Sequence, residues 1–244
     1  MAQYGFGSGS LFGIPSGSNP TPVQFGGLQD VSVDFNFSAK ELRGQFQFPI
    51  VVARGAGKIS WKAKSARLNG AALNALFFGG TNATGLQTGQ VAEAGTIPAG
   101  TPWQITVANS ATWLTDLGVV NGTTGVTMTR VASAPTTGQY SVAAGVYTFA
   151  AADANTPVLI SYVYTTAGVG NKTTITNQLM GAQTTFKMVL AETFQSKQLT
   201  LTLNACIANK WTLATKLEDF VIPEWDGAAF ADDNNVVGTL ALSE

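Results

Sequence analysis

The sequence contains no histidine and a single cysteine, Cys206, among 244 residues. An intrachain disulfide is therefore impossible, and metal sites built from thiolate and imidazole ligands are excluded. Nucleophilic catalysis by serine or cysteine would have to use a lysine or a carboxylate as its base, and no motif surrounds Cys206. These absences favour a chain that is not an enzyme and that uses neither a metal nor a cofactor.

Charged residues are also scarce, at 11% of the chain against about a quarter in typical soluble domains. Hydrophobic residues reach an ordinary 45%, so the chain can build a core and is not disordered. A net charge of −1 gives no electrostatic footprint for nucleic-acid binding. A surface with so little charge favours contact with other protein, because charge keeps soluble monomers apart.

Long apolar runs are absent as well. No window of about twenty residues is free of polar breakers, so we expect no transmembrane helix and no membrane insertion. The first ten residues contain no basic cluster followed by an apolar run, which argues against a secretory signal. We therefore expect the chain to fold in a cytoplasm without export.

Alternating apolar and polar residues are the main structural signal that is present. They predict half-buried antiparallel strands, most clearly over 31–38, 58–68 and 197–209. In the last of these, strict alternation puts Cys206 on the polar side. An alanine-rich segment with an asparagine cap, 69–78, is the best helix candidate. The fold class that we predict is mainly β: an antiparallel sandwich or barrel core with one short flanking helix and a β-rich insertion.

Composition divides the chain into three parts. Residues 1–22, rich in glycine, serine and proline, should form an extended N-terminal arm without a core of its own. This arm is either disordered or ordered on a neighbouring subunit, and its removal should leave the core folded. Residues 23–80 and 172–244 should supply that β core. Residues 81–171 form a low-charge, β-rich insertion.

Charge is segregated along the chain. Residues 40–67 carry a net charge of +6, and residues 218–244 a net charge of −7. Complementary patches can join subunits in one orientation, and solvated loops are the alternative. The candidates for contacts between subunits are these charged side chains and apolar residues of the arm: Phe6, Leu11, Phe12, Lys58, Lys62, Lys64, Arg67, Glu218, Asp219, Glu224, Asp226, Asp232 and Asp233.

Several segments carry a resemblance to a known family. Three consecutive stretches are similar to a module of phage tail and other virion proteins: 138–142, 145–154 and 158–164. The order of three C-terminal stretches, and the opening with Leu11-Phe12-Gly13, resemble tail tube subunits: 220–223, 231–233 and 237–240. The chain therefore resembles the major tail tube protein of tailed bacteriophages.

This resemblance implies a β-sandwich or barrel core with one flanking helix. It implies subunits that join their sheets into a closed ring, commonly six-fold, and rings that stack into a hollow tube. It also implies a tube formed around a tape-measure protein and in contact with other tail proteins, through which DNA passes without specific binding. The location implied is the virion tail, after synthesis in the cytoplasm of the bacterial host.

A channel that conducts DNA must not bind it tightly, and contacts with phosphates would add strong, salt-dependent affinity. We therefore expect polar and weakly charged side chains along the lumen. The lysines at positions 58, 62 and 64 should instead meet acids of the 218–244 segment or face outward. The lumen candidates are the polar sides of two strands: Ser32, Asp34, Asn36, Gln198, Thr200, Thr202 and Asn204.

Two other classes fit the composition. One is a different virion structural protein, such as a head decoration or tail completion subunit. The other is a β-sandwich adhesin or carbohydrate-binding module, which would use exposed Trp103, Trp113 or Tyr147.

Overall fold

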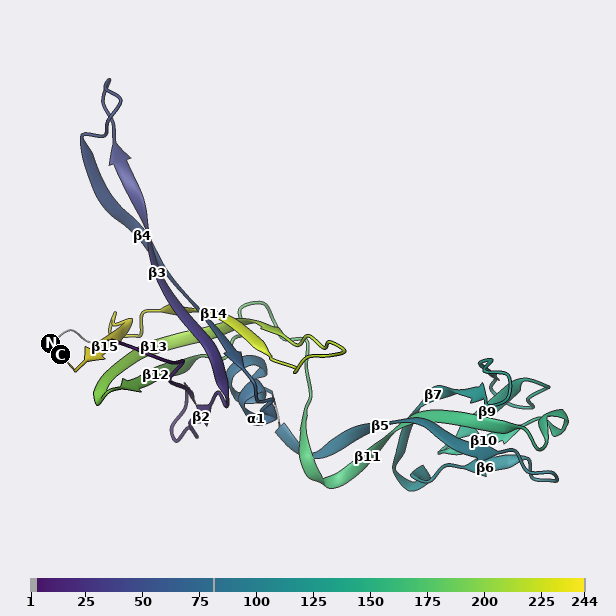
Figure 1. Ribbon diagram of the computed structural model, residues 1–244. Helices are drawn as coiled ribbons and strands as arrows, with labels where there is room; N and C mark the ends of the chain where they lie inside the picture. Colours follow the sequence, from purple (N-terminus) through teal and green to yellow (C-terminus); the bar gives the residue numbers. More distant parts are fainter. Residues whose placement is uncertain (1–3, 81, 244) are drawn as a thin grey trace. The chain divides into compact units, whose positions relative to one another are not determined.

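The computed structural model of the chain describes residues 4–80 and 82–243. Strands contain 56% of the residues and helices 6%, so the predicted mainly β fold with one short helix is confirmed. The chain forms two compact units (Figure 1). Unit 1 joins the residues up to Asn82 to those from Thr173 onward, and unit 2 is Ala83–Lys172. The boundaries of unit 2 differ by one or two residues from those expected for the insertion.

Unit 1 is built on one eight-stranded sheet in the order β2-β1-β12-β13-β14-β4-β3. β13 is long enough to pair with two strands along one edge: its first half pairs with β15 and its second half with β14. The strands are β1 (Ser10–Pro15), β2 (Val23–Gln24), β3 (Leu28–Leu42), β4 (Val51–Ser65), β12 (Phe186–Phe194), β13 (Lys197–Thr212), β14 (Glu224–Phe230) and β15 (Gly238–Leu242).

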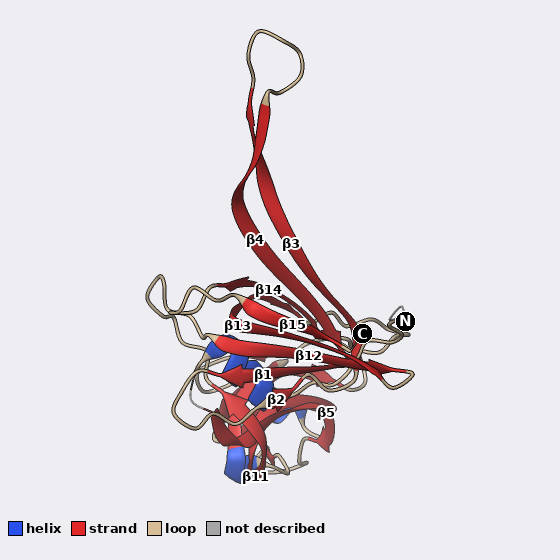
Figure 2. Ribbon diagram, turned by 90° about the vertical axis from the view of Figure 1, so that its left-hand side faces the viewer, coloured by secondary structure: helices blue, strands red, loops and turns tan. Residues whose placement is uncertain are grey.

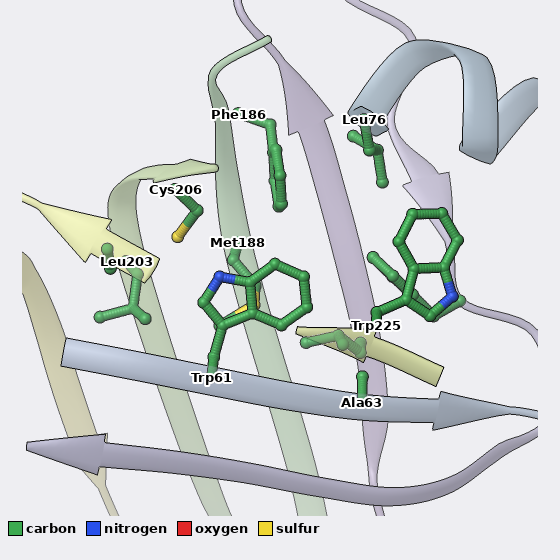
Figure 3. Close-up of a cluster of buried hydrophobic side chains, with 11 residues drawn as sticks. Trp61, Ala63, Leu76, Phe186, Met188, Leu203, Cys206 and Trp225 are labelled. Atoms are coloured by element: carbon green, nitrogen blue, oxygen red, sulfur yellow. The ribbon is translucent and has the colours of Figure 1, made fainter. Parts of the chain in front are cut away.

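One face of this sheet carries the hydrophobic core. Trp61 extends from β4 toward Met188, Cys206 and Phe186 (Figure 3), and its ring meets that of Phe186 edge-on at 5.8 Å. β14 makes room for this indole with Gly227, because a Cβ there would lie 2.3 Å from a ring atom of Trp61. The alternation over 59–63 of β4 thus has a physical basis: its odd-numbered side chains fill or border the core.

The short helix lies over this core. It begins as α1 (Gly70–Leu73) and continues as a π-helical turn, η1 (Asn74–Phe78). The Asn69 side chain caps it by accepting hydrogen bonds from two backbone N–H groups, and Gly79 ends it with a φ of 60°. Leu76, fully buried, packs against Gly13 of β1 and fixes the helix on the sheet.

Unit 2 is a small sandwich of two sheets, ordered β6-β10-β9-β8 and β5-β11-β7. Its own core contains four fully buried large side chains, Tyr147, Tyr162, Ile97 and Ile160. The elements are β5 (Asn82–Thr96), β6 (Gln104–Thr106), η2 (Ser110–Thr112), β7 (Trp113–Asn121), β8 (Thr129–Arg130), β9 (Gln139–Ala143), β10 (Val146–Phe149), η3 (Ala151–Asp153) and β11 (Pro157–Thr173).

The expectation that residues 1–22 form an arm contributing little to the core is wrong for residues 10–15. Residues 10–15 form β1, which pairs with β12 inside the sheet. Leu11 is fully buried in the core, and its carbonyl accepts a hydrogen bond from the N–H of Phe25, another core residue. The high glycine content misled the prediction, because Gly13 is required under Leu76 rather than marking a flexible chain.

The predicted side of Cys206 is also wrong. The register between β12 and β13 shifts between the pairs Met188–Leu203 and Phe186–Cys206. Such a bulge adds a residue to one strand and turns the following side chains to the other face. Leu203 and Cys206 therefore both point into the core, although strict alternation would separate them.

Replacing Leu11 with alanine should lower the free energy of unfolding by about 2–5 kcal/mol, because it leaves a cavity in the core. The matched control is Phe12→Ala, one residue along β1 on the opposite, partly exposed face. Urea unfolding of both variants measures the difference. A Leu11→Ala variant no less stable than Phe12→Ala would show that residues 10–15 lie outside the cooperative core.

Burial raises the pKa of the Cys206 thiol from 9.0 to about 12. Between these values the unfolded chain releases a proton that the folded chain keeps, so the free energy of unfolding should fall as the pH rises above 9. In a Cys206→Ala variant this part of the pH dependence should disappear. Rapid reaction of the native thiol with a water-soluble thiol reagent would contradict the buried position.

Candidate assembly surfaces

The face of the unit 1 sheet opposite the core is polar across four adjacent strands. The register sets Asp30 of β3, Lys64 of β4 and Glu224 of β14 in one row. The next row joins residues 32, 62, 226 and 210. We call this surface the polar face; it comprises Asp30, Ser32, Asp34, Asn36, Lys58, Ser60, Lys62, Lys64, Lys210, Glu224 and Asp226.

Charges on the polar face pair within one chain. The Lys64 Nζ lies 3.0 Å from the Glu224 carboxylate, and Lys210 lies 3.9 Å from Asp226. The hydrogen bond and charge of Glu224, with a further contribution from Asp30, raise the pKa of Lys64. The polar face holds four lysines and four carboxylates, so it carries no net charge. Lys64 and Glu224 do meet, as the charge segregation suggested, but inside one subunit rather than between two.

The separation that we expected between lumen candidates and lysines is wrong. Ser32 pairs across the strands with Lys62, and Asn36 pairs with Lys58. Directly paired residues of adjacent strands point to the same side of a sheet. Gln198, Thr200 and Thr202 lie on this same side, since they alternate with the core leucines of β13. Any lumen lined by Asp34 and its neighbours would include the lysines.

Other expected contact residues have different roles. Leu11 is buried and cannot reach another subunit, whereas Phe6 is exposed and lies 5.7 Å from the ring of Phe194. Asp232 accepts hydrogen bonds from two backbone N–H groups of its own turn, which lowers the pKa of its carboxyl group. The other carboxylate oxygen of Asp232 accepts a hydrogen bond from the side chain of Asn204. The contact candidate Asp232 and the lumen candidate Asn204 are therefore both engaged within the chain. Phe12, Arg67 and Asp233 are at least partly exposed.

The hairpin β3–β4 of unit 1 ends in an exposed apolar surface. Beyond Ile59, β4 pairs with β3 alone among the described residues, and the two strands leave the sheet together (Figures 1 and 2). We call residues 40–54 the hairpin tip. Phe48 is 80% exposed there. The other exposed large apolar side chains of the tip are Leu42, Phe46, Ile50, Val51 and Val52.

Two arginines near the end of the hairpin contact neighbouring groups. Arg43 donates a hydrogen bond to Glu41 (2.9 Å) and another to the carbonyl of Gln47, which closes the turn. The guanidinium of Arg54 lies 4.9 Å from the centre of the Phe37 ring. Sequence reasoning missed this surface because it treated the region only as a source of positive charge. The signal was present in residues 46–50, Phe-Gln-Phe-Pro-Ile, placed between two strand patterns.

A second exposed apolar surface joins β13 to β14. We call residues 213–224 the β13–β14 segment. Leu217 is 99% exposed and Phe220 89% exposed, on either side of Glu218 and Asp219. Lys216 forms an ion pair with Asp219 (3.4 Å) that holds this turn. The expected contact residues 218 and 219 therefore lie on an exposed, partly apolar loop.

Unit 2 contains a carboxylate, Asp116, whose side chain is only 4% exposed and has several hydrogen-bond partners. Asp116 accepts hydrogen bonds from the hydroxyls of Tyr140 (2.7 Å) and Tyr147 (3.0 Å) and from the N–H of Gly118. Burial, reinforced by hydrogen bonds to Asp116, raises the pKa of both tyrosines. The carboxylate thus ties β7 to the opposite sheet. Tyr147 is fully buried, so the expectation of an exposed Tyr147 that binds a glycan is wrong.

The described residues, 4–80 and 82–243, include no group of three or more histidine, cysteine or acidic side chains that could hold a metal ion. In the same part of the chain, no helix is both long and apolar enough to cross a membrane. No protein-family model matches the chain, and no curated protein matches it in sequence.

Reversing Lys64 to glutamate should lower the melting temperature at low salt, because three carboxylates then share one row of the polar face. The matched control is Lys58→Glu, which changes the net charge equally but lies opposite the uncharged Asn36. The difference between the variants should shrink in about 1 M salt, where screening acts within about 3 Å. Equal melting temperatures at low salt would show that the row has no energetic role.

Proposed function

We propose that this chain is a structural subunit that assembles with copies of itself into stacked rings, and that these rings form the hollow tail tube of a bacteriophage. The tube encloses a tape-measure protein, contacts other tail proteins and then passes DNA without binding it specifically. The proposal combines the resemblance of the sequence with three features of unit 1.

The observation that carries the proposal is the hairpin tip. A monomer gains nothing from extending two strands beyond the sheet and exposing six large apolar side chains at their end. Contiguous exposed apolar surface of this kind marks sites of protein interaction. The paired strands give the tip a fixed form before any contact, which lowers the entropic cost of assembly.

The open sheet supports the same proposal. β3 is fifteen residues long and, within the described residues, pairs with β4 only, so its other edge has free backbone groups. Long exposed edges invite pairing with another chain, and joining them between copies removes the hazard. A head-to-tail contact repeated around an axis closes a ring when its rotation allows.

The charge balance of the polar face supports the proposal that DNA passes through the tube. Its four lysines are balanced by four carboxylates, so phosphates meet no net positive surface on it. Binding to DNA follows the number of phosphates that cations neutralise. A face with no net charge can therefore line a channel without retarding DNA, even though it contains lysines.

Removing residues 40–53, all of the hairpin tip except Arg54, tests the proposal. We would join Ala39 to Arg54, which are paired residues, through an Asn-Gly turn. The variant should fold, because the core lies on the other side of Ile59, but it should sediment as a monomer and form neither rings nor tubes in electron micrographs.

The control is the full chain, which should form rings or short tubes at modest concentration. A full chain that stays monomeric at high micromolar concentration would overturn the proposed function. Tubes that persist without the tip would remove the observation on which it depends.

A further inference from the structure

The hairpin tip and the β13–β14 segment lie at opposite ends of one strand. β4 begins within the tip, at Val51, whereas Lys64 near the other end of β4 pairs with Glu224, the last residue of the segment. Thirteen residues of strand separate these points by roughly 40 Å. The two surfaces therefore cannot meet within one chain, but a second copy displaced along β4 can bring them together.

A groove beside the β13–β14 segment could accept apolar side chains of a second copy. This groove of about 290 Å³ is lined by Thr212, Phe220, Ile222 and the Lys64–Glu224 pair. Leu217 and Phe220 expose their rings or methyl groups almost completely. Aromatic and branched side chains of the hairpin tip, above all Phe46 and Phe48, are of the same chemical kind and equally uncovered.

Charge on the two surfaces is opposite. The hairpin tip carries three cations and one carboxylate, a net charge of +2, and the β13–β14 segment carries one cation and three carboxylates, a net charge of −2. Opposite potentials across an interface favour one docking orientation and oppose others. Tip against tip, or segment against segment, would bring like charges together.

We infer that the hairpin tip of one copy docks on the β13–β14 segment of a second copy, head to tail. This inference rests on the proposed function only in requiring self-association, and it names the surface that receives the tip. Phe46 and Phe48 pack against Leu217 and Phe220, and Arg54 lies near Glu218. Because the two surfaces differ, the contact repeats along an axis instead of stopping at a dimer.

A lipid surface is the other partner that an apolar tip with cations could take. The structure favours a protein partner, because Glu41 already pairs with Arg43 and Arg54 lies against Phe37. Attraction to an anionic bilayer needs several unpaired cations, each contributing about 1 kcal/mol. Vesicle binding is therefore an outcome to be tested rather than the expectation.

Site-specific crosslinking tests the contact. Gln45→Cys and Glu218→Cys place thiols on the hairpin tip and on the β13–β14 segment, both at exposed positions. The wild-type Cys206 is buried and serves as the unreactive background. With a short bismaleimide, a mixture of the two single variants should give a covalent dimer, and the double variant should give a ladder of higher oligomers.

Three results would overturn the inference. One is a dimer from Gln45→Cys alone, which would mean that tips meet each other. Another is efficient crosslinking of Gln45→Cys to a control thiol at Thr123 of unit 2 but not to one at position 218. The third is rings or tubes in electron micrographs with no crosslink between tip and segment; the proposed function would then stand without this contact. A chain that does not assemble at all would instead overturn both.

Charge reversal provides an independent readout. Arg54→Glu and Glu218→Arg should each weaken self-association roughly tenfold at low salt, and the double variant should recover most of the loss. Flotation with vesicles of phosphatidylserine and phosphatidylcholine should leave the wild-type protein unbound. Tip-dependent flotation, together with no recovery in the double variant, would assign the tip to a membrane and overturn the inference.

Discussion

The packing of Trp61 against Gly227 is the constraint on which unit 1 depends. The indole lies in the core, in edge-on contact with Phe25 and Phe186, and touches the backbone of β14 where any side chain would collide with it. A Cβ at Gly227 would also lie 2.2 Å from the carbonyl oxygen of Ile207 in β13. One side chain thus sets the spacing of three strands.

This constraint also anchors the hairpin β3–β4. Trp61 is close to the point where β14 stops pairing with β4, and the strands continue outward from there. The rigid base and the exposed tip are therefore parts of the same two strands. Force applied at the tip is therefore transmitted to the core through paired strands rather than through a loop.

Regular strands and the short helix could be predicted from the sequence, whereas irregular features such as bulges could not. Alternation in β3 and β4 predicted their faces, and Asn69 with Gly79 predicted the helix, because these signals are local. Cys206 was misplaced because a bulge in β13 depends on pairing with β12, a contact distant in sequence.

The candidate surfaces were predicted only in part. Residues 218 and 219 were expected in a contact and lie on an exposed loop, whereas Leu11 was expected there and is buried. The distribution of charge along the chain could not show that Lys64 and Glu224 are neighbours in one subunit, since only strand order places them side by side. The apolar hairpin tip had a readable sequence, but its exposure depends on where β14 ends.

Three of the five charged side chains of unit 2 accept hydrogen bonds from within the unit. Asp116 is held by tyrosine hydroxyls, Asp153 accepts from the backbone N–H of Gly138, and Glu93 accepts from Tyr162 and from the N–H of Ala108. Arg130 and Lys172 are the remaining charged residues of this unit. Its surface is consequently almost indifferent to ionic strength and steers no charged molecule toward it. Salt should thus adjust the protein through unit 1, while unit 2 meets its surroundings by shape and hydrogen bonding under any ionic condition.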